Sequence, residues 1–171
     1  MSTLRRLIAP ATCFALAGIL AVGPTEAAEA CKQLHATLQS HVVEAGTTAC
    51  PISCTAGVVT GDGLLRGMTH FTATGLAPGG GLTTTNPNTT FSDSGTFMLT
   101  TNHGTLTTSS IGMFDLANGV FFDIGTVSGG TGRFEGATGT LFFFGSVVQT
   151  TGGPLALVFE GDIRGEVCLV K

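Results

Sequence analysis

The C-terminal segment has the clearest alternation of hydrophobic and polar side chains in the chain. Over residues 155–170, hydrophobic side chains occupy alternate positions: Leu155, Leu157, Phe159, Ile163, Val167 and Leu169. Charged side chains lie between them: Glu160, Asp162, Arg164 and Glu166. Successive residues of a strand point to opposite faces, so this pattern predicts a strand with one buried and one solvated face.

Upstream segments are rich in Thr, Val and Phe, and Gly separates them every few residues. Such side chains favour strands, whereas Gly favours the turns between them. The predicted strands cover residues 34–43, 63–75, 89–101, 105–113, 119–127 and 140–150, and the first of these is also compatible with a helix. Segments 44–57 and 75–90 are predicted loops. Evenly spaced strands without a helical period indicate an all-β closed meander or a sandwich.

The N-terminal 30 residues have the features of a cleaved signal peptide. Arg5 and Arg6 precede an apolar stretch, and Ala28-Glu29-Ala30 fits the small-x-small rule for cleavage after Ala30, with Ala27 as an alternative. The stretch, about 16 residues, is short for spanning a bilayer. We therefore predict a secreted or periplasmic protein.

Composition excludes two classes of partner and limits the number of domains. The net charge is −4, with 7 basic and 11 acidic residues, so no basic patch exists to bind nucleic acid. No segment after residue 30 is long and apolar enough to span a membrane. The mature chain, about 141 residues, fits one domain. Within it, residues 31–56 are expected to form a strand and a disulfide-stapled loop, and residues 57–171 the barrel.

The segment VSGGTGRFEGATGTL, residues 127–141, resembles the Gly-rich segment of the allene oxide cyclase and dirigent-type barrels. Segments 57–67, 100–112 and 157–165 also fit that pattern. The resemblance implies an eight-stranded antiparallel closed barrel around an apolar cavity. Gly129, Gly130 and Gly132 would then turn a barrel corner, and Phe134 would plug the barrel end.

In such a barrel the first and last strands are neighbours that run in opposite directions. Cys31 near the start of the mature chain would therefore meet Cys168 near its end, which leaves Cys50 to pair with Cys54 across the turn favoured by Pro51. The rival pairing joins Cys31 to Cys50 and Cys54 to Cys168, if residues 31–50 form a separate flap. A metal site is disfavoured, because no second close cysteine pair or paired histidines accompany these residues.

The function implied by the resemblance is an exported barrel that binds a small apolar molecule. If it is an enzyme, it would be a cyclase or isomerase that templates its substrate without a cofactor. The alternative is a non-catalytic structural or interaction barrel with a filled core. A cavity of roughly 300 Å³ or more, lined by Phe and Leu with one or two acids, would favour ligand binding.

Polar side chains within an apolar barrel are the candidates for chemistry, because burial shifts their pKa values toward use as acid or base. The candidate catalytic residues on or beside predicted strands are Asp123, Asp115, His70 and Arg66. Asp123 has the most apolar flanks. The predicted cavity-lining residues are Phe97, Phe122, Phe143, Leu157 and Phe159. Segment 140–150 is apolar on both faces, which indicates a homo-oligomer through its outer face.

Overall fold

The structure is a computed structural model that describes residues 29–61, 63–79, 88–153 and 156–170. Residues 1–28 of the predicted signal peptide lie outside the described residues, as does Leu155 of the last predicted strand. Glu29 and Ala30, the last two residues of the predicted signal peptide, pair with Val170 and Leu169 in a sheet. Among the described residues, no helix has the length and hydrophobicity to cross a bilayer.

Eight antiparallel strands form a closed barrel in which each strand pairs with its neighbours in the sequence, and the last strand pairs with the first. The strands are β1 (Glu29–Glu44), β2 (Cys54–Gly61), β3 (Gly67–Pro78), β4 (Thr90–Thr101), β5 (Gly104–Asp115), β6 (Val120–Gly130), β7 (Thr138–Gln149) and β8 (Leu157–Val170). A 3-10 helix, η1 (Gly132–Phe134), joins β6 to β7. The predicted eight-stranded antiparallel barrel is confirmed.

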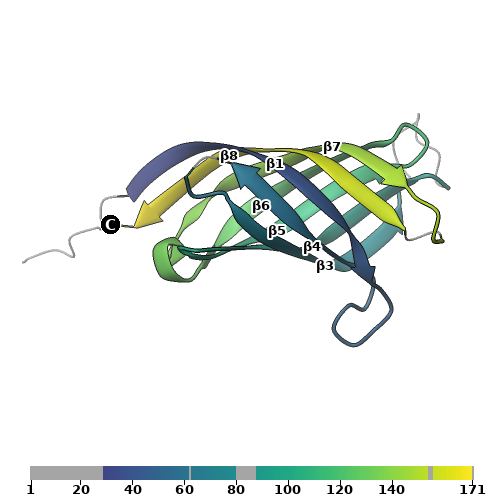
Figure 1. The fold of residues 1–171 in the computed structure, drawn as a ribbon, viewed down its shortest axis with the longest axis horizontal. Helices are drawn as coiled ribbons and strands as arrows, with labels where there is room; N and C mark the ends of the chain where they lie inside the picture. The colour runs from purple at the N-terminus through teal and green to yellow at the C-terminus, as the bar shows by residue number, and fades with distance from the viewer. Residues whose placement is uncertain (1–28, 62, 80–87, 154–155, 171) are drawn as a thin grey trace, which may run out of the picture.

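Figure 1 shows that the two ends of the barrel differ. The start of β1, the end of β8 and η1 lie at one end, here called the closed end. The β1–β2 loop and the β7–β8 loop lie at the other end, here called the open end.

Two strand predictions need correction. Strand β2 was not predicted, because its segment contains Gly57 and follows the Cys-Pro run that indicated a loop. The boundary expected between residues 56 and 57 therefore falls inside a strand. Strand β3 begins at Gly67 rather than at Gly63, which has a positive φ of 62° and belongs to the turn that precedes β3. The first strand, also compatible with a helix, is extended throughout.

The closed end is filled by large side chains. Phe134 of η1 is fully buried, and Leu64 and Leu65 of the β2–β3 connection are 4% and 1% exposed. Gly132 permits this plug, because its φ of 60° lies in the left-handed region and the backbone of His103 packs closely against it. The prediction that Phe134 plugs the barrel end is confirmed.

Both disulfides follow the predicted connectivity. Cys31 and Cys168 are opposite each other in the β1–β8 ladder and are bonded, which ties the two ends of the described chain together. Cys50 and Cys54 are bonded across the β1–β2 loop, with Cα atoms 5.5 Å apart. The rival pairing of Cys31 with Cys50 is excluded.

Candidate functional site

A cavity of about 90 Å³ lies inside the barrel toward the open end. All eight strands contribute inward side chains to its wall, and so does Ser53 of the β1–β2 loop. The volume exceeds the ~10–15 Å³ that one water needs, but it is well below the ~300 Å³ of pockets that enclose drug-sized ligands. The volume expected to favour ligand binding, ~300 Å³ or more, is therefore not reached, and the core holds a smaller unfilled space of about 90 Å³.

Four of the five predicted cavity residues line this space: Phe97, Phe143, Leu157 and Phe159. The prediction for Phe122 was wrong, since this side chain is 45% exposed on the outer face and stacks near Phe142. Phe121, Phe122 and Asp123 are consecutive, so the sequence alone does not show whether Phe122 or its two neighbours face inward. A one-residue change of register exchanges the inner and outer faces of a strand.

Two carboxyl groups project into the cavity from β4 and β6. Asp93 and Asp123 each lie three residues after the start of their strand, and both are opposite Gly112 of β5 in the two ladders. The row across the three strands is therefore Asp93, Gly112 and Asp123. A Cβ atom at Gly112 would collide with the carboxyl group of Asp123. Because Gly112 has no side chain, the carboxyl group of Asp123 lies over its backbone, toward Asp93.

A row of aromatic rings lies between this carboxyl pair and the open end. Phe91, Phe114 and Phe121 are opposite one another across β4, β5 and β6, two residues nearer the open end than the acids. Phe91 stacks on Phe114 at 5.3 Å, and Phe121 packs edge-to-face on Phe159 of β8 at 5.5 Å. Asp93 and Asp123 therefore lie behind this aromatic row rather than at an open surface.

Small residues form the next row inward, on the side of the acids that faces the closed end. Gly95, Ser110 and Gly125 are opposite one another, and the ring of Phe71 lies directly over Gly95. The Ser110 hydroxyl is hydrogen-bonded to the buried Thr108 hydroxyl at 3.0 Å. Gly95 and Gly125 therefore make room for the rings of Phe71 and Phe143, and Ser110 is the member of this row that lines the cavity.

Burial raises the pKa of both carboxyl groups. The pKa of Asp123 rises from 3.8 to about 8, first because burial disfavours the charged form and second because of the nearby charge of Asp93. The pKa of Asp93 rises to about 6, also through burial, which its own backbone N–H partly offsets. At pH 7 the pair therefore carries about one proton. Two acids whose pKa values lie apart can act as one general acid and one general base.

Asp115, the second acid predicted for the site, is instead part of the β5–β6 turn. Its Oδ1 accepts hydrogen bonds from the backbone N–H groups of Ala117 and Asn118, and its Oδ2 accepts one from the Asn118 side chain at 2.7 Å. The side-chain bond from Asn118 is the main reason that the pKa of Asp115 is lowered. Asp115 caps a turn and does not line the cavity.

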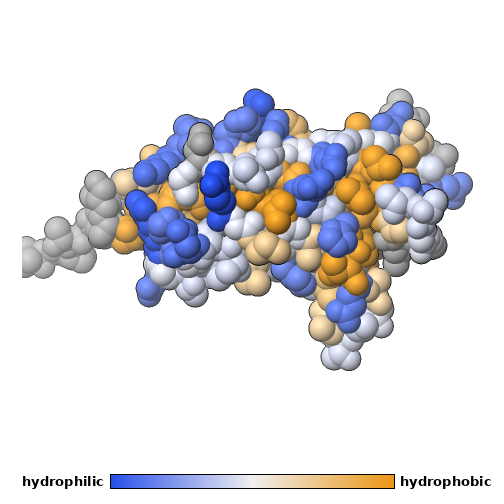
Figure 2. All heavy atoms as spheres, in the orientation of Figure 1, coloured by the Kyte–Doolittle hydropathy of each residue, from blue (hydrophilic) through white to orange (hydrophobic). Residues whose placement is uncertain are grey.

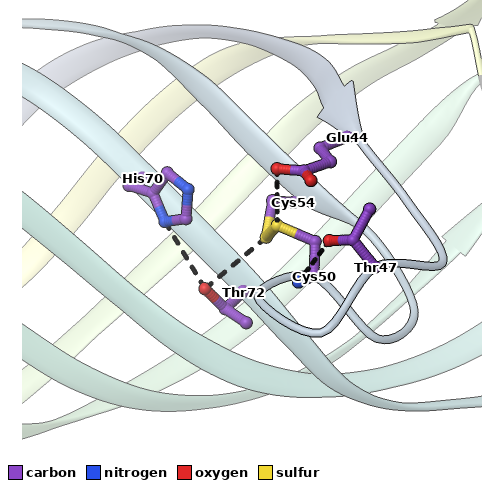
Figure 3. Close-up of a disulfide and its surroundings, with 6 residues drawn as sticks. All are labelled: Glu44, Thr47, Cys50, Cys54, His70 and Thr72. Atoms are coloured by element: carbon purple, nitrogen blue, oxygen red, sulfur yellow. Dashed lines mark hydrogen bonds between the residues drawn. A yellow bond between two sulfur atoms is a disulfide. The ribbon is translucent and has the colours of Figure 1, made fainter.

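His70 and Arg66 also lie outside the cavity. His70 follows inward-facing Thr69 on β3, points to the outer face, and its Nδ1 is 3.4 Å from the Thr72 hydroxyl beside the Cys50–Cys54 disulfide (Figure 3). Arg66 is exposed in the β2–β3 connection at the closed end, near His103. Of the four predicted catalytic candidates, only Asp123 lines the cavity.

Sequence reasoning did not single out Asp93 or Thr69. A shared signal was present for the acids, because Phe91-Ser92-Asp93 and Phe121-Phe122-Asp123 both place a Phe two residues before an Asp near a strand start. Residues two apart lie on the same strand face, so this pattern places each Phe and its Asp on one side of the sheet. Thr69 had no such signal in the sequence.

Two groups of three potential metal ligands occur among the described residues. One joins Cys50, Cys54 and His70, and the other joins Cys31, Cys168 and Glu166. Each contains a disulfide, and oxidised sulfur does not supply the thiolate that binds a metal. Neither group lies among the residues that line the cavity.

No protein-family model, no curated protein and no solved structure matches this chain. The relation to the allene oxide cyclase and dirigent-type barrels stays a prediction.

Proposed function

We propose that this protein is an exported barrel that binds a small, largely apolar molecule in the cavity at its open end. The observation that carries this proposal is the unfilled space below the aromatic row, with Asp93 and Asp123 projecting into it. A barrel stabilised by core packing alone would have inward-facing large side chains here, as it has at the closed end. Two disulfides are typical of a protein that folds in an oxidising compartment.

The cavity volume limits the ligand. About 90 Å³ is less than the ~150 Å³ of an engineered cavity that binds benzene. The ligand is therefore a molecule of a few heavy atoms, or the terminal group of a longer molecule that extends past the aromatic row. The walls are mostly Phe, Leu and Val, and the carboxyl pair supplies the polar contacts.

A reaction at this site would be a cyclisation or isomerisation without a cofactor. The Phe side chains would hold the substrate in one conformation, Asp123 would donate a proton and Asp93 would accept one. The alternative function, a non-catalytic structural or interaction barrel, predicts that the cavity binds nothing.

We propose that the outer face of β5, β6 and β7 pairs with a second copy of the chain. Ile111, Ile124 and Phe142 are opposite one another across these strands and are 66%, 37% and 38% exposed. On the side where β1 and β8 lie, hydrophilic and hydrophobic side chains are intermixed (Figure 2). Light scattering with size-exclusion chromatography tests this proposal, and Ile124→Lys should convert a dimer or larger assembly to a monomer.

NMR spectra of the 15N-labelled, disulfide-bonded protein under xenon, an apolar probe of a single atom, test ligand binding. Shift changes should be confined to the residues around the cavity, such as Phe97 and Phe143. Ala73→Leu should abolish the changes, because Ala73 is 3% exposed in the cavity wall and the larger side chain fills the space. Thr96→Leu, a similar enlargement on the exposed face of β4, is the control and should leave binding intact. Absence of xenon binding at saturation would favour the structural alternative.

A further inference from the structure

The carboxyl groups of the cavity have no cationic side chain beside them among the described residues that line it. Among the cavity-lining residues that the structure describes, the titratable groups are Asp93 and Asp123, and none is Lys, Arg or His. The ion pairs of the described chain lie outside, where Asp162 of β8 contacts His35 and Arg164, each at 3.4 Å. A buried carboxylate without a cation or several donors is unfavourable, and buried charges in proteins are normally paired.

Thr69 gives a second, independent indication that the cavity has a polar occupant. Its side chain is in the cavity wall, the residue is 4% exposed, and its Oγ1 has no hydrogen-bond partner. Leaving a buried hydroxyl without a partner is unfavourable by about 1–3 kcal/mol. A purely hydrocarbon ligand would leave both this hydroxyl and the carboxyl pair unsatisfied.

We propose that the ligand of this cavity is a small organic monocation, namely a primary ammonium ion on a compact apolar body, whose ammonium group lies between the carboxyl groups of Asp93 and Asp123. The proposal rests on the function proposed above and specifies the class of ligand. An ammonium group has three N–H donors, enough to bond both carboxyl groups at once. The apolar body then contacts the Phe side chains around the acids.

Two other classes of ligand fit the site less well. An anion would be repelled by the carboxylate of Asp93. A hard divalent cation such as Ca²⁺ or Mg²⁺ takes six or more oxygen ligands, or retains several waters, whereas the neighbours of the pair are Gly112 and the aromatic row. The groups of three potential ligand atoms found among the described residues are elsewhere.

Binding of the ammonium ion should strengthen as the pH rises. The empty cavity retains a proton on Asp123 at pH 7, and a cation between the two groups favours the form in which both are ionised. The ammonium group itself stays charged until about pH 10. The dissociation constant should therefore fall by about tenfold between pH 6.5 and pH 8.5, because the ionised fraction of a group with a pKa about 8 rises by at least that factor.

The test is an NMR titration of the disulfide-bonded protein with butylammonium, 1-butanol and butyrate, which share their size and differ in charge. Butylammonium should bind most tightly, about tenfold better at pH 8.5 than at pH 6.5, and butyrate should not bind. Asp123→Asn should remove the pH dependence and weaken butylammonium binding by at least about tenfold, the effect of losing one charged partner. Asp93→Asn serves as the second variant, and Asp162→Asn, on the outer face, is the matched control that should change nothing.

Two results would overturn the inference in different ways. If 1-butanol binds in the cavity as tightly as butylammonium, and Asp123→Asn has no effect, the cavity binds apolar molecules but does not select a cation. The proposed function then survives and the ligand class is wrong. If none of the three compounds and no xenon binds, the proposed function fails together with the inference.

Discussion

The two ends of the barrel are built from the same eight strands but use their inward positions differently. At the closed end, large apolar side chains fill the interior, and Leu99, Leu106 and Phe134 are fully buried. At the open end, the inward positions of β4, β5 and β6 include Gly95, Gly112 and Gly125. Packing at one end stabilises the whole closed sheet, since each strand runs from one end to the other. That stability allows unfavourable groups at the other end, namely the two half-buried acids of the cavity wall.

The two disulfides also differ between the closed end and the open end. Cys31–Cys168 is near the closed end and links residues 137 apart, whereas Cys50–Cys54 links residues 4 apart at the open end. In the chain-entropy model the longer closure stabilises more, because it restricts the unfolded chain more. The closed end therefore holds both the filled core and the more stabilising cross-link.

The largest expected effect is the loss of the long disulfide. Replacing Cys31 and Cys168 together by Ser should lower the free energy of unfolding by about 5 kcal/mol, and replacing Cys50 and Cys54 by about 2 kcal/mol. Urea denaturation of the two double variants measures both values. Equal losses would contradict the difference between the ends.

The second effect concerns the plug. Phe134→Ala should lower the free energy of unfolding by about 3–5 kcal/mol, because it leaves a void among buried side chains. Phe122→Ala, on the exposed outer face, is the control and should lower it by roughly 1 kcal/mol or less. Denaturation curves measure the two losses. A Phe134 variant as stable as the Phe122 variant would show that η1 does not close the barrel.

The third effect is the gain of stability at high pH that should result from replacing Asp123 by Asn. The pKa of Asp123 is raised in the folded state, so the folded protein binds more protons than the unfolded chain, and stability is lost as the pH rises from about 4 toward 8. Asp123→Asn should therefore be more stable than the unchanged protein at pH 8, by on the order of 1–3 kcal/mol, and the gain should shrink as the pH is lowered toward 4. Asp162→Asn is the control. A variant that is less stable at pH 8 would mean that the Asp123 carboxylate has a stabilising partner.

The smallest effect concerns Gly112, which lies between the two acids in the ladders. Gly112→Ala should displace the Asp123 carboxyl group and lower the free energy of unfolding by about 1–3 kcal/mol. In the double variant with Asp123→Ala, much of that loss should disappear, because the collision is removed. A double-mutant cycle measured by denaturation should give a coupling energy of about 0.5–3 kcal/mol. Additive losses would mean that the two positions do not touch.

The sequence predicted the closed end better than the open end, for a physical reason. The alternation in β8, the plug at Phe134 and the terminal disulfide each depend on a local pattern or on barrel closure alone. The pairing of Asp93 with Asp123 depends instead on the register of three strands, and a shift of one residue in any strand would separate the acids. Strand β2 was missed because its pattern is short and interrupted by Gly57.

For the open end, the sequence predicted the type of site, an apolar cavity with acidic side chains, better than it predicted the residues that form the site. Asp123 and four of the five apolar residues line the cavity. Alternation did not decide the inward face of β6, because the adjacent Phe122 and Asp123 were both predicted to face inward and Phe122 lies outside. Asp115, His70 and Arg66 were misplaced, because near a strand end a polar residue belongs to a turn or an outer face as readily as to the interior. Deciding between these positions requires knowledge of where each turn begins.

The two carboxyl groups that lie together behind the aromatic row at the open end can be observed directly. Titration of the side-chain carboxyl carbons by 13C NMR, in the ligand-free protein, measures their pKa values. We expect a pKa of about 8 for Asp123 and about 6 for Asp93, with a lowered pKa for Asp115 as the internal reference. Values near 3.8 for both Asp93 and Asp123 would instead show that the two groups are separate and in contact with water.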